Sequence, residues 1–129
     1  MRTPLLALAA ISSLALPAAA AERRTPEAEL ARVIDGRVAG DPTDCINNLR
    51  FTSSRIIDGT AIVYESGDTV WVNRPRGGAR GLDKWDVLVT RQFSSQLCRG
   101  EIVRLYDTAS RMQTGAIVLG EFVPYRRAR

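Results

Sequence analysis

From residue 49 onward the chain is a series of short runs of β-branched and aromatic residues, and each run ends at a turn signal. These runs occupy residues 51–57, 60–65, 69–73, 87–90, 102–106 and 116–123. Short strands separated by frequent turns are typical of small antiparallel β structures. The pattern predicts a mainly β fold, with about six strands in a small antiparallel curled sheet or barrel.

The turn signals between these runs have recognisable chemistry. Asp58-Gly59 separates the first two runs and is a pair favoured in type I′ hairpins, where both central residues take a positive φ. Ser66-Gly67 separates the second run from the third. Three glycines and a proline crowd residues 74–81, which predicts an exposed loop, and a helical turn is expected near residues 82–86.

Residues 22–44 precede the β pattern and are expected to form a solvated lead-in and one short helix. Thr25 is suited to the N-cap of that helix, and Gly36 is suited to end it. Leu30 and Val33 then lie on one face, so the helix can pack against a sheet.

The first 21 residues have the organisation of a secretory signal peptide. Arg2 supplies a positive charge, residues 5–16 are largely apolar, and residues 17–21 consist of proline and alanine, which suit cleavage by a signal peptidase. The apolar stretch is shorter than the ~20 residues that a membrane span needs. We therefore expect a periplasmic or secreted protein whose mature form has no transmembrane segment.

The expected organisation is a signal peptide followed by one small domain with a single hydrophobic core. Its parts are the signal peptide at 1–21, the lead-in and helix at 22–44, the β domain at 45–125 and a basic tail at 126–129.

Cys45 and Cys98 are the two cysteines of the chain. In the oxidising compartment that an exported protein enters, two cysteines within reach of each other usually form a disulfide. A redox-active pair is the alternative, but such cysteines are usually two residues apart. We expect one disulfide that stabilises the fold.

The chain contains no histidine, which removes the usual general base and the commonest metal ligand. We expect neither a metal nor a cofactor. Acid–base hydrolysis by paired carboxylates stays open. Six acidic residues form the pool for it, and each lies beside a turn, so turn capping explains them more simply: Asp58, Asp68, Asp83, Asp86, Glu101 and Asp107.

A candidate ligand-binding site combines the loop arginines Arg74, Arg76 and Arg80 with the flanking Trp71 and Trp85. Cations beside flat aromatic surfaces resemble sites for single-stranded nucleic acid. Because export removes that partner, the expected ligand is an anionic envelope glycan, a lipid headgroup or an acidic protein. The alternative is that the tryptophans belong to the core and the arginines are merely solvated.

Five short segments carry a resemblance to a known family: residues 36–42 before Cys45-Ile46, and residues 55–59, 72–74, 97–101 and 119–125. Through them the chain resembles a family of small exported alphaproteobacterial proteins, sphingomonad proteins especially, of unknown function. The closing Leu-Gly-Glu-Phe-Val-Pro-Tyr at 119–125 is the most specific segment. The resemblance implies export and a β fold, and it implies no reaction.

Family members often have two further cysteines, at the positions of Ala79 and Ile117, and both are absent here. The resemblance therefore also leaves Cys45 to pair with Cys98. The function expected from the sequence is a binding or envelope-associated module held by one disulfide. The alternative is a carboxylate-dependent hydrolase that acts on cell-wall or surface glycan, with two acids facing each other in a cleft.

Overall fold

The computed structural model describes residues 24–129, so the predicted signal peptide at 1–21 lies outside the described residues. The elements in chain order are α1 (Pro26–Val33), β1 (Arg37–Ala39), β2 (Cys45–Asn47), the 3-10 helix η1 (Asn48–Arg50), β3 (Ser53–Ile57), β4 (Ala61–Ser66), β5 (Thr69–Asn73), β6 (Asp86–Thr90), β7 (Gln96–Cys98), β8 (Ile102–Asp107), β9 (Gln113–Val118) and β10 (Phe122–Arg127).

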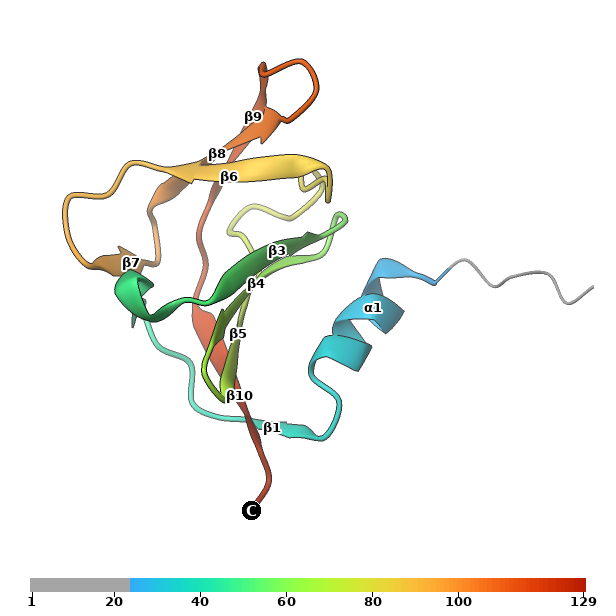
Figure 1. The fold of residues 1–129 in the computed structure, drawn as a ribbon, viewed down its shortest axis with the longest axis vertical. Coiled ribbons are helices and arrows are strands. Elements are labelled where there is room, and N and C mark those ends of the chain that lie inside the picture. The colour runs from blue at the N-terminus through green and yellow to red at the C-terminus, as the bar shows by residue number, and fades with distance from the viewer. Residues whose placement is uncertain (1–23) are drawn as a thin grey trace, which may run out of the picture.

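The strands form three antiparallel sheets (Figure 1). Sheet A has five strands in the order β1-β10-β5-β4-β3, sheet B pairs β2 with β7, and sheet C has the order β6-β8-β9. The predicted mainly β, antiparallel fold with one N-terminal helix is confirmed. The described part of the chain has ten strands instead of about six, and they close into no barrel.

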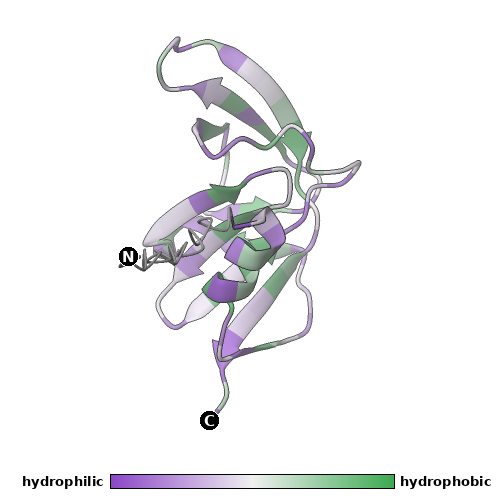
Figure 2. Cartoon of the chain, turned by 90° about the vertical axis from the view of Figure 1, so that its right-hand side faces the viewer, coloured by the Kyte–Doolittle hydropathy of each residue, from purple (hydrophilic) through white to green (hydrophobic). Residues whose placement is uncertain are grey.

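Sheet A is the middle layer of the molecule. Figure 2 shows α1 lying over one face of this sheet, and sheet C stands at one end of the view. The β4 strand explains the arrangement, because Ala61 and Val63 belong to the cluster beneath α1 while Ile62 and Tyr64 belong to the larger core on the opposite face. Successive side chains of a strand point to opposite faces, so β4 is apolar at every position from 61 to 64.

The larger core lies between sheet A and the two smaller sheets. It takes Ile62 from sheet A, Leu97 from sheet B and Leu105 from sheet C. Tyr64 is buried here with its ring 5.0 Å from that of Phe51. Burial, with a smaller effect from the negative charge of Glu101, raises the pKa of Tyr64 well above its usual range, so this residue remains a neutral core side chain.

Helix α1 begins and packs as its sequence predicts. The Thr25 hydroxyl accepts a hydrogen bond from the Ala28 backbone N at 3.2 Å, which caps the first turn. Leu30 is buried in the smaller core, and Val33 packs against the same cluster. Gly36 follows the helix with a φ of +69°, a conformation that favours glycine.

Two expected boundaries do not separate structural units. β1 pairs with β10, and Arg37 lies opposite Arg127, so the segment 22–44 contributes a strand to sheet A. The predicted tail 126–129 likewise begins inside β10. Three-residue strands such as β1, β2 and β7 are too short to produce a visible alternation in the sequence.

The turn at Asp58-Gly59 differs from the predicted type I′. Gly59 has a φ of +56°, whereas Asp58 is not among the residues with a positive φ, and type I′ needs both. Hydrogen bonds to the segment 82–84 stabilise the turn instead. Gly59 N donates to the Leu82 carbonyl at 2.9 Å, and Asp58 Oδ1 accepts from Lys84 N at 2.6 Å. In the segment 82–86, where a helical turn is expected, Asp86 N donates to the Asp83 carbonyl at 3.0 Å and closes a single turn.

The predicted disulfide between Cys45 and Cys98 is present. The two cysteines lie opposite each other in the β2–β7 pair, so the bond joins the two strands of sheet B. Their neighbours Ile46 and Leu97 are buried in the larger core. The disulfide therefore links the two strands of sheet B to each other at the edge of the larger core.

The expected strand at 116–123 is two strands in different sheets. β9 ends at Val118 in sheet C, and β10 begins at Phe122 in sheet A. Between them, the buried Asn73 side chain donates to the Gly120 carbonyl and accepts from Gly120 N, both at 2.9 Å. We call this pair of bonds the Asn73–Gly120 clamp. A Cβ at Gly120 would lie 2.2 Å from the Arg74 carbonyl oxygen, so the crossing requires glycine.

Replacing Cys98 with serine should destabilise the protein under oxidising conditions. In the chain-entropy model a bond closing a loop of this length is worth about 4 kcal/mol. We expect the thermal unfolding midpoint to fall by roughly 10 °C or more. Wild-type protein reduced with dithiothreitol is the control and should unfold near the midpoint of the variant. An unchanged midpoint in Cys98→Ser would contradict a stabilising role.

Gly120→Ala should cost about 2 kcal/mol or more, because the added methyl group collides with backbone that cannot move freely. Gly115→Ala is the matched control, since its Cβ would make only an ordinary contact with Leu105 at 3.8 Å. Urea unfolding of both variants measures the difference. Equal stability of the two variants would show that the crossing does not require glycine.

Candidate functional site

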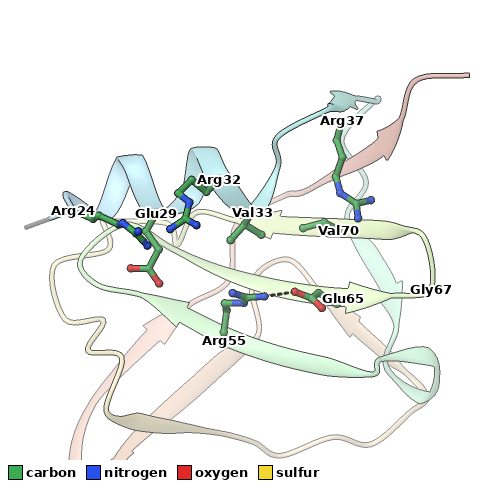
Figure 3. A pocket seen from close by; sticks show the side chains of 9 residues that line it. All are labelled: Arg24, Glu29, Arg32, Val33, Arg37, Arg55, Glu65, Gly67 and Val70. Atoms are coloured by element: carbon green, nitrogen blue, oxygen red, sulfur yellow. Dashed lines mark hydrogen bonds and ion pairs between the residues drawn. The ribbon is translucent and has the colours of Figure 1, made fainter.

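A groove lies between α1 and the β3–β5 part of sheet A (Figure 3). Its volume is about 510 Å³, and we call it the arginine groove. Four arginines and two glutamates line it, together with small and apolar residues: Arg24, Glu29, Arg32, Val33, Arg37, Arg55, Glu65, Gly67 and Val70. Arginine is thus its most frequent side chain.

Separate elements bring these side chains to one place. Arg32 and Glu29 are three residues apart on α1, so they lie on the same side of the helix. Arg37 comes from β1, which reaches this position by pairing with β10. Arg55 and Glu65 come from the neighbouring strands β3 and β4, and Figure 3 shows them facing each other below the helix.

The charges of the groove are incompletely balanced. Arg55 Nη2 lies 2.5 Å from Glu65 Oε1, so these two residues neutralise each other. The Arg37 guanidinium donates to the backbone carbonyl of Asp68, which carries no full charge. Within residues 24–129, neither Arg24, Arg32 nor Arg37 forms an ion pair with a carboxylate. Glu29 adds a second carboxylate, so the four arginines exceed the two glutamates and the groove carries a net positive charge.

The hydrogen bond from Arg55 lowers the pKa of Glu65 below its ordinary value. A hydrogen bond with Ser53 and the charges of Arg55 and Arg37 act in the same direction, while partial burial opposes them. Glu65 is therefore ionised at neutral pH, and its carboxylate already forms an ion pair with Arg55. The remaining arginines of the groove are available to an anion from outside.

The predicted loop arginines lie in a different hollow. Arg74 and Arg76 gather there with Arg99, over an apolar floor that includes Val123 and Tyr125, in a volume of about 390 Å³. We call it the loop hollow. Carboxylates already engage two of its arginines, because Arg74 Nη1 lies 3.2 Å from Glu27 Oε1 and Arg99 Nη1 lies 2.9 Å from Glu121 Oε1.

The two predicted tryptophans do not join these arginines. Trp71 packs against the larger core, on the face of sheet A opposite to Val72 in the loop hollow, because neighbouring residues of β5 alternate between faces. The guanidinium of Arg126 lies 5.7 Å from its ring. Trp85 is 70% exposed and lines a third hollow with Arg80. The five predicted residues therefore occupy three separate places.

Three acids of the predicted pool line that third hollow, whose volume is about 710 Å³. Asp86 lies opposite Asp107 across the β6–β8 pair. Asp86 accepts from the Thr114 hydroxyl at 2.6 Å, and Asp83 accepts from Trp85 N at 2.9 Å. Hydrogen bonds from the Ser110 hydroxyl and from the backbone of the same turn lower the pKa of Asp107. Each of these three carboxylates therefore accepts a hydrogen bond from a neighbouring residue of the protein.

Sequence reasoning missed Arg32, Arg37 and Arg55 as members of one site. They belong to α1, β1 and β3, and no spacing in the chain connects them. The only local signal is the Glu29 and Arg32 pair on the polar side of the helix. The pairing of β1 with β10 is a long-range contact that no motif announces.

Among residues 24–129 there is no group of three acidic or cysteine side chains placed to hold a metal ion. No helix in this range is long and apolar enough to cross a membrane. Comparisons with protein-family models, curated proteins and solved structures found no match to this chain. The interpretation of the site therefore depends on its own geometry.

Replacing Arg55 with glutamine should weaken the protein in a pH-dependent way. Glu65 has a depressed pKa in the folded state, so the pair stabilises the fold above the ordinary value of 4.5 and loses that effect as the pH falls. We expect a loss of less than about 1 kcal/mol at pH 7, since the pair is partly exposed.

Urea unfolding at pH 7 and at pH 3 measures this effect, and the difference from wild type should shrink at pH 3. The carboxyl resonance of Glu65 should also titrate closer to 4.5 in the variant. Arg50→Gln is the control, because Arg50 forms no ion pair within the described residues. A difference of equal size at both pH values would contradict the assignment.

Proposed function

We propose that this protein is an exported binding module of the cell envelope and that it binds an anionic ligand in the arginine groove. The observation that carries the proposal is that Arg24, Arg32 and Arg37 line one groove, outnumber its free carboxylate Glu29, and form no ion pair among the described residues. Guanidinium groups bind carboxylate and phosphate through paired hydrogen bonds. The ligand class is therefore a carboxylate- or phosphate-bearing envelope component.

Three observations support export to the periplasm or the outside of the cell. The first 21 residues have the charge, the apolar stretch and the small residues of a signal peptide. The closing segment 119–125 is the basis of the expected resemblance to a family of exported proteins. The Cys45–Cys98 disulfide is a bond that oxidising compartments maintain.

The groove is held in shape by elements that do not depend on a ligand. Arg37 is fixed by its bond to the Asp68 carbonyl, and Arg55 is fixed by Glu65. Sheet A forms the base, and α1 is anchored to it through the buried Leu30. Groups held in place before binding lose less conformational entropy when the ligand arrives.

The alternative of a carboxylate-dependent glycan hydrolase has weaker support. Hydrolysis by two carboxyl groups needs one of them to keep its proton near neutral pH, which requires a raised pKa. In the third hollow, lined by Asp83, Asp86 and Asp107, hydrogen bonds lower the pKa of Asp107, and Asp86 already accepts a hydrogen bond from Thr114. Asp107 caps its own turn, and Asp86 accepts a hydrogen bond from Thr114 of β9, so both carboxylates have structural roles.

The double variant Arg32→Ala with Arg37→Ala tests the proposal with two probes, inorganic tripolyphosphate and a short oligogalacturonate. Each lost charge-assisted hydrogen bond is worth roughly 1.5–3 kcal/mol, so we expect at least tenfold weaker binding of whichever probe binds the wild type. Isothermal titration calorimetry at low salt measures the dissociation constant. Thermal unfolding checks that the variant is folded.

Two further double variants remove the same number of charges elsewhere. Neither residue of the variant Arg80→Ala with Arg129→Ala lines the arginine groove or the loop hollow, so this variant should bind like wild type. Arg74→Ala with Arg76→Ala alters the loop hollow. Loss of binding only in this last variant would assign the site to the loop hollow, and wild-type protein that binds neither probe would overturn the proposal.

A further inference from the structure

Two exposed segments from distant parts of the chain are joined at one edge of the molecule. The 3-10 helix η1 follows β2, and the loop 91–95 connects β6 with β7; both lie at the left of Figure 1. Asn48 N donates to the Ser95 carbonyl at 3.0 Å, and the Asn48 side-chain amide donates to Gln92. These bonds hold η1 and the loop side by side.

Each of these segments exposes a large apolar side chain. Phe93 is 92% exposed and Leu49 is 78% exposed, and they are the two most exposed large hydrophobic residues of the described part of the chain. Neither contributes to a core cluster. Apolar side chains gathered at the surface mark sites of interaction, because water contact with them is unfavourable.

The outer face of sheet C continues this apolar surface. Val89 of β6 and Ile102 of β8 are exposed, and they line a shallow hollow together with Phe93. Their neighbours Leu88 and Val103 point the other way, into the larger core. We call the combination of Leu49, Phe93, Val89 and Ile102 the outer apolar surface.

Arginines surround the outer apolar surface. Arg50 ends η1, Arg91 begins the loop, and Arg104 lies beside Ile102 in the same hollow; all three are exposed. Glu101 is the one acid that lines this hollow, and its carboxylate accepts a hydrogen bond from Cys98 N. The charge around the surface is therefore positive.

We infer that the outer apolar surface binds an anionic lipid bilayer. Leu49 and Phe93 would enter the boundary between headgroups and acyl chains, and the surrounding arginines would contact lipid phosphates. Exposed apolar groups combined with basic residues are what reversible attachment to such a surface requires. The inference rests on the proposed export only in placing the protein next to an envelope membrane.

A second copy of the chain fits this surface less well. A two-fold contact would place the same patch of both copies together, and with it the Arg50, Arg91 and Arg104 side chains that surround each patch. Like charges brought together in this way repel one another. The phosphates of an anionic bilayer supply the opposite charge instead.

The test uses protein expressed with its own N-terminal segment, purified from the periplasm and checked by mass spectrometry for a common N-terminus. Binding is measured by co-sedimentation with vesicles of phosphatidylcholine alone or of phosphatidylcholine mixed with anionic phosphatidylglycerol. We expect wild type to bind the anionic vesicles and the double variant Leu49→Ser with Phe93→Ser to bind about tenfold less. Met112→Ser is the matched control, since Met112 is 68% exposed on the β8–β9 hairpin, and it should bind like wild type.

Three results would overturn the inference. One is wild-type protein that does not sediment with the anionic vesicles. Another is full binding by Leu49→Ser with Phe93→Ser but loss of binding in Arg32→Ala with Arg37→Ala, which would assign the lipid contact to the arginine groove. The third is a dimeric wild type that becomes monomeric in the Leu49 and Phe93 variant, which would identify the surface as a contact between copies.

The same proteins separate this inference from the proposed function. Leu49→Ser with Phe93→Ser should bind the anionic probe of the arginine groove with wild-type affinity, because Leu49 and Phe93 do not line the groove. Failure of vesicle binding would leave the groove proposal unaffected. Failure of the groove variant to change probe binding would leave the bilayer inference unaffected.

Discussion

The Asn73–Gly120 clamp is the interaction on which the rest of the fold depends. At this point the chain passes from β9 of sheet C to β10 of sheet A, and both Asn73 and Gly120 are buried there. The Asn73 side chain supplies both partners that Gly120 needs. An unmade buried hydrogen bond costs about 1–3 kcal/mol, so the crossing is held at one position. The two sheets can then share the core that contains Leu119 and Phe122.

The division of sheet A into two covered faces follows from that crossing. Sheets B and C cover one face and bury the larger core, with the disulfide joining the strands of sheet B. The other face receives α1, which is narrower than the sheet and leaves part of it uncovered. The arginine groove and the loop hollow both use residues of this face, Val70 in one and Val72 in the other. The site is therefore a consequence of a short helix lying on a five-stranded sheet.

Two surfaces of different chemistry result. The arginine groove is polar, fixed by internal hydrogen bonds and suited to a compact anion, whereas the outer apolar surface combines Leu49 and Phe93 with surrounding arginines. They use separate elements, α1 and β1 with part of sheet A for the groove, and η1, the loop 91–95 and sheet C for the outer surface. Under the two proposals, the protein could rest on a membrane and keep its groove open to an anionic ligand.

The sequence by itself determined the features that depend on local spacing or on residue counts. The Thr25 cap, the face of α1 that holds Leu30, the β5 strand and the pairing of the two cysteines all follow from neighbouring residues or from there being only two cysteines. Only the tertiary structure decided that residues 116–123 divide between two sheets, that Trp71 faces away from the loop arginines, and that the arginines of α1, β1 and β3 form one groove. Those outcomes depend on contacts between residues far apart in the chain, such as Arg37 with Arg127, and side-chain pattern along the chain does not specify them.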